Sequence, residues 1–190
     1  MSLSATQVAN PRSRAFEVAV QIAMVVSASI FVAVCARIYI PLPGTPVPLT
    51  VQNLGVLLVG LALGSRRAFL AMALYLVEGA SGLPVFSAGA SGITQIIGFT
   101  GGYLIAYPFV AGLTGYLFER AKPTFVRAAL ACLSGEVLLF TFGISWLYVL
   151  THSLAKALSF GLYWFIFAEI LKIMFAAGTV RAWRVLTARE

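Results

Sequence analysis

The chain has 190 residues, of which 61% are hydrophobic and only 10% are charged, and its mean hydropathy is +0.97. Soluble domains carry about 25% charged residues, so this composition argues against a chain whose surface faces water. The formal net charge is +7, but most cations fall in four separate clusters instead of one continuous face, which argues against a nucleic-acid partner.

The four basic clusters alternate with connections that hold few cations. The positive-inside rule gives this pattern for an even number of membrane spans with both termini in the cytoplasm. The chain is long enough for about six spans of roughly 20 residues and too short for an additional soluble domain. We therefore expect a single membrane domain over residues 1–190. The clustered cations are Arg12, Arg14, Arg66, Arg67, Arg120, Lys122, Arg127, Arg181, Arg184 and Arg189.

The first predicted span covers residues 16–40 and has no charge between Glu17 and Arg37. It is long enough to cross a bilayer with some tilt. The next segment, PLPGTPVPLT (41–50), holds four prolines, which forbid a regular helix and favour an extended outer loop.

Small residues repeat at intervals of four along the first span. Such a stripe lets another helix approach closely. It either docks a partner protein or packs the span within its own bundle, and the sequence leaves both open. The stripe consists of Ala15, Ala19, Ala23 and Ser27.

Two short spans, 50–63 and 68–79, are separated by a glycine stop and an arginine pair at 64–67. The region that follows is uncharged but too rich in glycine and proline for one long helix. We expect its first part, EGASGLPVFSAGASG (78–92), to dip toward the membrane or cap a cavity. Irregular backbone at membrane depth is tolerated only where it is buried in protein or lines a cavity. A span over 98–118 follows.

The last two spans are predicted at 128–150 and 158–183, which completes an all-α bundle of six membrane helices with irregular outer loops. Glu169 and Lys172 lie three residues apart on one helix face and can pair. Charges inside spans usually face a cavity or the bundle interior, so both are site candidates. The alternatives are a structural ion pair or a lysine that snorkels to the headgroups. For Glu136 a structural role is the favoured interpretation.

Several motifs of catalysis are absent from the sequence. It has no Walker P-loop, no HExxH zinc motif, no Gly-x-Ser-x-Gly elbow and no Cys/His cluster, and Cys35 and Cys132 lie in apolar stretches. We therefore expect no enzyme activity, no metal, no cofactor and no ATP hydrolysis by the chain itself. A solute-binding membrane protein needs only a cavity with a few convergent polar groups.

Five segments together resemble a known family. They are PLPGTPVPLTVQNLGVLLVGLALGSRR (41–67), YLVEGASGLPVFSAGASG (75–92), GFTGGYLIAYPF (98–109), GISWL (143–147) and FAEILK (167–172). They look like the signature of the biotin-specific substrate-capture subunits (S components) of energy-coupling-factor (ECF) transporters, the BioY family.

The resemblance implies a compact six-helix bundle in the bacterial cytoplasmic membrane that takes biotin from outside, with gating by the outer connections after spans 1 and 3. It implies association with a membrane coupling protein and two ATPases, and assigns Ala19 and Ala23 to the docking face. Some family members occur without that module, so a solitary carrier is also possible. The other functions considered are a carrier for another small carboxylated vitamin and an intramembrane enzyme or assembly protein.

Biotin's chemistry matches the polar residues available. Its ureido ring has two N–H donors and one carbonyl acceptor, so Glu169 is expected to accept the N–H groups and Lys172 to meet the carbonyl. Polar contacts are also expected from span 2, and aromatic side chains are expected to shield the apolar middle of biotin. These further contacts are Thr50, Gln52, Asn53, Phe86, Tyr103 and Trp146.

The sequence also departs from the family pattern at several positions. Glu169 stands where Asp is typical, Trp164 and Phe167 stand where prolines are expected, and Phe99 replaces a further proline. Glu78 is also unusual at its position. These departures bear on the shape of the outer site and on where the last helix begins.

Overall fold

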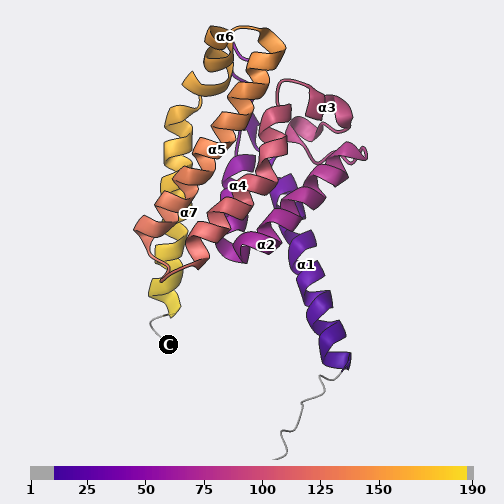
Figure 1. The fold of residues 1–190 in the computed structure, drawn as a ribbon, viewed down its shortest axis with the longest axis vertical. Helices are drawn as coiled ribbons and strands as arrows, with labels where there is room; N and C mark the ends of the chain where they lie inside the picture. Colours follow the sequence, from indigo (N-terminus) through magenta and orange to yellow (C-terminus); the bar gives the residue numbers. More distant parts are fainter. Residues whose placement is uncertain (1–10, 188–190) are drawn as a thin grey trace, which may run out of the picture.

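The computed structural model describes residues 11–187 and the side chains of residues 14–180. Within these residues the fold is a helical bundle with one short two-stranded ribbon (Figure 1). The elements are α1 (Pro11–Cys35), β1 (Tyr39–Ile40), β2 (Leu49–Thr50), α2 (Gln52–Ala80), the 3₁₀ turn η1 (Ser87–Gly89), α3 (Ile93–Ile97), α4 (Gly101–Glu119), α5 (Phe125–Thr151), α6 (Leu154–Leu158), the π-helical segment η2 (Ser159–Tyr163) and α7 (Ile166–Thr187).

The all-α fold class is confirmed, whereas the expected count of six helices is slightly off. The described residues contain seven α-helices, and the two spans expected at 50–63 and 68–79 form the one element α2. This element is nevertheless a hairpin. The Gln52 side chain donates a hydrogen bond to the Tyr75 hydroxyl at 2.8 Å, although a straight helix would separate these residues by about 35 Å.

The hairpin turns at Gly64, where the sequence predicted a stop. Gly64 has a φ of 74° and a ψ of 175°, outside the helical range. A β-carbon there would also lie 2.4 Å from Oε2 of Glu119, the last residue of α4. That carboxylate accepts the backbone N–H of Ser65 at 3.1 Å. It thus satisfies a donor that the break removes from the helical ladder, at a helix start that favours negative charge.

The two segments predicted from proline and glycine are confirmed as irregular connections between helices. The proline-rich one is bounded by β1 and β2, which pair antiparallel with Tyr39 opposite Thr50. The glycine-rich one contains η1 and leads into the short helix α3, which the sequence analysis did not predict.

The last predicted span, 158–183, is a broken helix in the structure, and its regular α-helical part begins only at Ile166. The preceding part, Leu154–Tyr163, is bent 40° away from it. Two backbone carbonyls in that part accept hydroxyl donors from distant segments. Thr45 donates to Phe160 at 2.7 Å, and Tyr103 donates to Gly161 at 2.9 Å. These tertiary hydrogen bonds stabilise a non-α path through η2.

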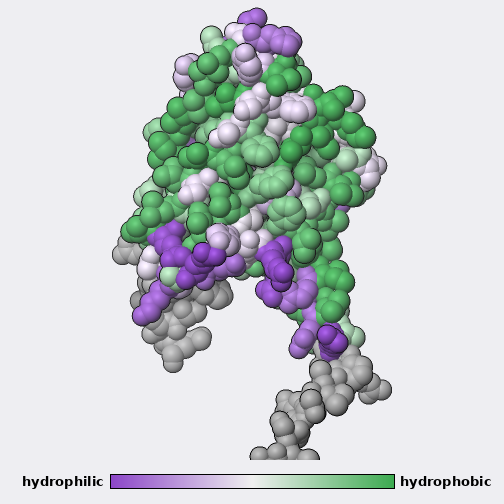
Figure 2. Space-filling view, viewed as in Figure 1, coloured by the Kyte–Doolittle hydropathy of each residue, from purple (hydrophilic) through white to green (hydrophobic). Residues whose placement is uncertain are grey.

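Three helical stretches in the described residues are long and apolar enough to cross a membrane by themselves, namely Arg14–Cys35, Gln52–Ala80 and Phe125–Thr151, and the bent pair before and in α7 gives a fourth. Figure 2 shows an apolar middle with hydrophilic residues toward the two ends of the drawn face. We call the end with the Gly64 turn and the α4–α5 connection (120–124) the hairpin end. The end with α3 and α6 is the cavity end (Figure 1).

Close contact between α2 and α4 depends on glycine. A β-carbon on Gly115 would lie 2.5 Å from the carbonyl carbon of Gly64 and 2.6 Å from the backbone nitrogen of Ser65. Both neighbours are backbone atoms and cannot turn aside as a side chain would. The absence of a side chain at position 115 therefore allows α4 to pack against the turn of the α2 hairpin.

We expect Gly115→Ala to lower the free energy of unfolding by about 1–3 kcal/mol, because the added methyl group overpacks the α2–α4 contact. The matched control is Gly178→Ala, where an added β-carbon meets no atom within 4 Å. That variant should be neutral or more stable by up to about 1 kcal/mol. Thermal unfolding of the purified variants in detergent measures both, and equal midpoints would contradict the predicted overpacking.

Candidate binding cavity

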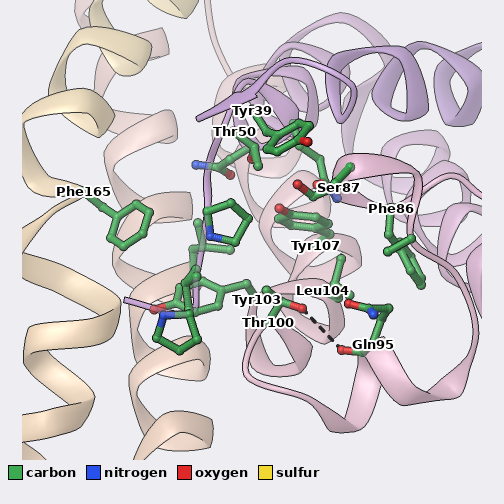
Figure 3. A pocket seen from close by; sticks show the side chains of 18 of the residues that line it. Tyr39, Thr50, Phe86, Ser87, Gln95, Thr100, Tyr103, Leu104, Tyr107 and Phe165 are labelled. Carbon is green, nitrogen blue, oxygen red and sulfur yellow. Dashed lines mark hydrogen bonds between the residues drawn. The ribbon is translucent and has the colours of Figure 1, made fainter. Parts of the chain in front are cut away.

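A cavity of about 360 Å³ opens among the helices and loops of the cavity end (Figure 3). Its volume lies in the range of small-molecule sites. Five segments contribute to its wall, which combines aromatic and aliphatic side chains with a few polar ones. The lining residues are Tyr39, Pro46, Val47, Pro48, Thr50, Gln52, Asn53, Phe86, Ser87, Ala88, Ala90, Gln95, Thr100, Tyr103, Leu104, Tyr107, Leu139, Phe140, Phe165, Glu169 and Lys172.

An ion pair lies in the cavity wall at the start of α7. Lys172 Nζ lies 2.7 Å from Glu169 Oε1, so the pairing predicted from the three-residue spacing is confirmed. Glu169 occupies the first turn of α7, where the helix N-terminus favours a negative charge. The late start of α7 therefore places this carboxylate at a helix end instead of in a helix interior.

Asn53 joins two acidic residues from different helices. Its Nδ2 donates to Glu169 Oε2 at 2.8 Å and to Glu136 Oε1 at 2.6 Å. Asn53 and both glutamates are buried. Since α2 carries Asn53, α5 carries Glu136 and α7 carries Glu169, this one amide connects three helices. We call Asn53, Glu136, Glu169 and Lys172 the polar cluster.

Glu136 belongs to the polar cluster but does not line the cavity. Its Oε2 and the Oδ1 of Asn53 are buried without a hydrogen-bond partner in the described part of the chain. The Asn53 side chain lies in the cavity wall, but its Oδ1 is covered by protein atoms, so the accessible acceptor of the polar cluster is Glu169. The contact with Asn53 fits the favoured interpretation of Glu136 as a structural residue.

Seven of the eight predicted ligand-contact residues line the cavity, and Trp146 does not. The indole Nε1 of Trp146 donates to the backbone carbonyl of Gly98 at 2.9 Å. Its Cβ packs against Gly102, where an added β-carbon would clash with it. Trp146 therefore fastens the segment before α4 to α5.

Several lining residues were not predicted from the sequence. Tyr107 follows Tyr103 by four positions on α4, so helical spacing alone could have placed it on the same face. Phe165 lies in the break before α7, and Ser87 lies in η1. No periodic signal identifies these two, because their positions depend on irregular backbone.

The predicted docking alanines lie far from the cavity, on α1. Ala19 and Ala23 are exposed, and Figure 1 shows the first part of α1 projecting from the body of the bundle. Ala19 also lies in a shallow surface hollow with Val18 and Ile22. Ala19 and Ala23 therefore do not belong to the core of the described part of the bundle.

The cavity suits a small molecule with an apolar body and a polar head that both donates and accepts hydrogen bonds. The polar cluster offers a carboxylate acceptor beside an ammonium donor, while Phe86, Tyr103, Tyr107 and Phe165 supply aromatic surface. Within the described residues, no group of three or more His, Cys, Asp or Glu side chains is placed to hold a metal ion.

Comparisons with known proteins give consistent results. The family model described as the BioY family matches residues 6–189. The biotin transporter BioY of Thermotoga maritima is 33% identical over 153 residues, which covers 80% of this chain and 90% of that protein. The biotin transporter BioY of Rhizobium etli is 35% identical over 165 residues, with 82% and 87% covered.

A solved structure has a similar fold. The crystal structure of the S-component for biotin from an ECF-type ABC transporter matches with a TM-score of 0.80 at 24% sequence identity, covering 88% of this chain and 92% of that chain. At this level of identity the likeness concerns the fold.

Asn53→Leu should lower the free energy of unfolding by roughly 3 kcal/mol or more, because it leaves two buried carboxylates without their shared donor. Gln95→Leu is the control, since Gln95 also lines the cavity but lies outside the polar cluster. Thermal unfolding without ligand compares the two. If Asn53→Leu were as stable as Gln95→Leu, the polar cluster would not be a structural link between helices.

Proposed function

The chain belongs to the BioY family, and from this membership and the cavity we propose that it captures biotin and carries it across the cytoplasmic membrane. The chain is a membrane protein and a transporter component, not an enzyme. The alternatives of another vitamin as substrate or an intramembrane enzyme gain no support from its relatives. The polar cluster beside an aromatic wall is the observation that carries the proposal.

The proposed pose places the ureido ring of biotin against the polar cluster. Lys172 and Asn53 each engage one oxygen of Glu169, but a carboxylate has about four lone-pair sites and can still accept ligand N–H groups. Lys172 has further hydrogens for the ureido carbonyl. The aromatic side chains would cover the thiolane ring and the start of the valeryl chain.

Purified protein should bind labelled biotin, and unlabelled biotin should compete better than other carboxylated vitamins. Glu169→Gln should weaken binding by roughly 2–4 kcal/mol, some tens- to several-hundredfold, because a buried charge-assisted acceptor is lost. Lys172→Ala should be at least as harmful, since it leaves Glu169 as a buried charge without its cation.

The double variant Glu169→Gln with Lys172→Met separates a binding role from a structural one, because it leaves neither charge of the pair behind. We expect a folded protein that no longer binds biotin. Near-native affinity in this variant, with a thermal-stability control, would contradict the assignment of the ligand contacts to α7.

We also propose a partner and an orientation. In this proposal an ECF coupling protein packs against Ala19 and Ala23, and two ATPases supply the energy; action as a solitary carrier remains the alternative. Both termini would lie in the cytoplasm, and residues 1–10 and 188–190, including Arg189, lie outside the described residues. The cations gathered at the hairpin end support this orientation. Arg127, whose side chain donates to the Leu117 carbonyl at 2.9 Å, lies beside the cations at 120–122. The cations at 66–67 lie across from them, next to the contact between Ser65 and Glu119.

Ala19→Leu combined with Ala23→Leu should abolish partner-driven uptake while leaving biotin affinity nearly unchanged, because the added bulk blocks close helix approach at an exposed face. Ala155→Leu is the control, since Ala155 is exposed on α6 at the opposite end of the bundle. Uptake by cells and biotin binding in detergent provide the two measurements. Unchanged uptake in the double variant would contradict the docking face.

A further inference from the structure

The loop between α2 and α3, residues 81–92, forms one side of the cavity wall. Phe86 from this loop is buried and lines the cavity. Its ring lies edge-on to that of Tyr75, with ring centres 5.6 Å apart, over a surface left open by Gly79. The position of the loop therefore decides whether the cavity has this wall.

Two side chains hold the loop in place by hydrogen bonds to neighbouring backbone carbonyl groups. The Tyr75 hydroxyl donates to the carbonyl of Val85 at 2.8 Å, and the Arg37 guanidinium donates to the carbonyl of Pro84. Arg37 is exposed, whereas Tyr75 is fully buried. The same stretch of backbone is thus held once from the surface and once from the interior.

Of these two hydrogen bonds, the one from Tyr75 is linked to the cavity. Gln52 lines the cavity and donates through Nε2 to the Tyr75 hydroxyl at 2.8 Å. That hydroxyl accepts from Gln52 and donates its own hydrogen to Val85, so the three groups form one directed chain from the cavity wall to the loop backbone. Hydrogen bonds in such a chain polarise and strengthen one another in a medium of low dielectric constant.

We propose that Tyr75 is a positioning residue that couples occupancy of the cavity to the closed position of the 81–92 loop. The inference rests on the proposed capture of biotin. A ligand that contacts Gln52 fixes its side chain, which keeps the Tyr75 hydroxyl directed at Val85 and Phe86 in the cavity wall. In the empty cavity water competes for the Gln52 amide, and the loop loses this restraint while keeping the one from Arg37.

Labelling of a cysteine in the loop reports its position. Leu83 is 51% exposed, so Leu83→Cys in a background without Cys35 and Cys132 provides a reactive thiol on the loop. In this parent protein we expect saturating biotin to slow thiol labelling. Biotin binding and dissociation are measured on the same samples with labelled biotin.

Tyr75→Phe in this background should remove the protection that biotin gives, although biotin still binds, and should speed dissociation about tenfold, the loss expected for one buried hydrogen bond. Arg37→Met is the matched control, because it releases the same loop without touching the chain from the cavity. It should speed labelling with and without biotin, while biotin still slows it. Tyr148→Phe, at an exposed tyrosine of α5, should behave like the parent.

Gln52→Met tests the same chain from the cavity side if Tyr75→Phe does not fold. At saturating biotin it should also lose the protection of the loop. If biotin slowed labelling of the loop cysteine in either variant as much as in the parent, the proposed coupling would be overturned. Failure of the parent to bind biotin would instead contradict the proposed function, and the coupling to biotin with it.

Discussion

The amide of Asn53 is the interaction on which the rest of the structure depends. In an apolar bundle two carboxylates from different helices need donors, because burial without partners costs several kcal/mol. Asn53 donates to both Glu136 and Glu169, and Lys172 supplies the cation. The polar cluster fixes the relative positions of α2, α5 and α7, and it leaves polar groups in the cavity wall. The same few atoms thus stabilise the fold and define the site.

The two breaks in the helices follow one physical rule. At Gly64 the chain turns where the Glu119 carboxylate accepts an N–H of the next residue, and before α7 the hydroxyl groups of Thr45 and Tyr103 donate to carbonyls that leave the α-helical pattern. Backbone groups within a membrane bundle need such partners, since no bulk water is present. These breaks bring Asn53 and Glu169 to one end of the bundle, where the cavity lies.

The cavity wall is built partly from long helices and partly from irregular segments. Long helices carry the polar cluster, whose geometry has to be held closely for selective recognition. The irregular segments 39–50 and 81–92 supply further parts of the wall. Thr45 holds the first by a side-chain hydrogen bond, and Tyr75 and Arg37 hold the second. None of these hydrogen bonds involves a residue of the polar cluster. The exposed alanines of α1 lie away from both parts, which leaves them available to a partner.

The sequence by itself determined the features that depend on local patterns. Composition specified a membrane bundle, proline and glycine located the irregular segments, and a spacing of three residues paired Glu169 with Lys172. Only the tertiary structure decided where α7 begins, that Asn53 contacts Glu136 across 83 positions, and that Trp146 faces the Gly98 backbone instead of the cavity. Those outcomes depend on contacts between helices, and the periodicity of a single helix carries no information about which side chain a neighbouring helix brings to it.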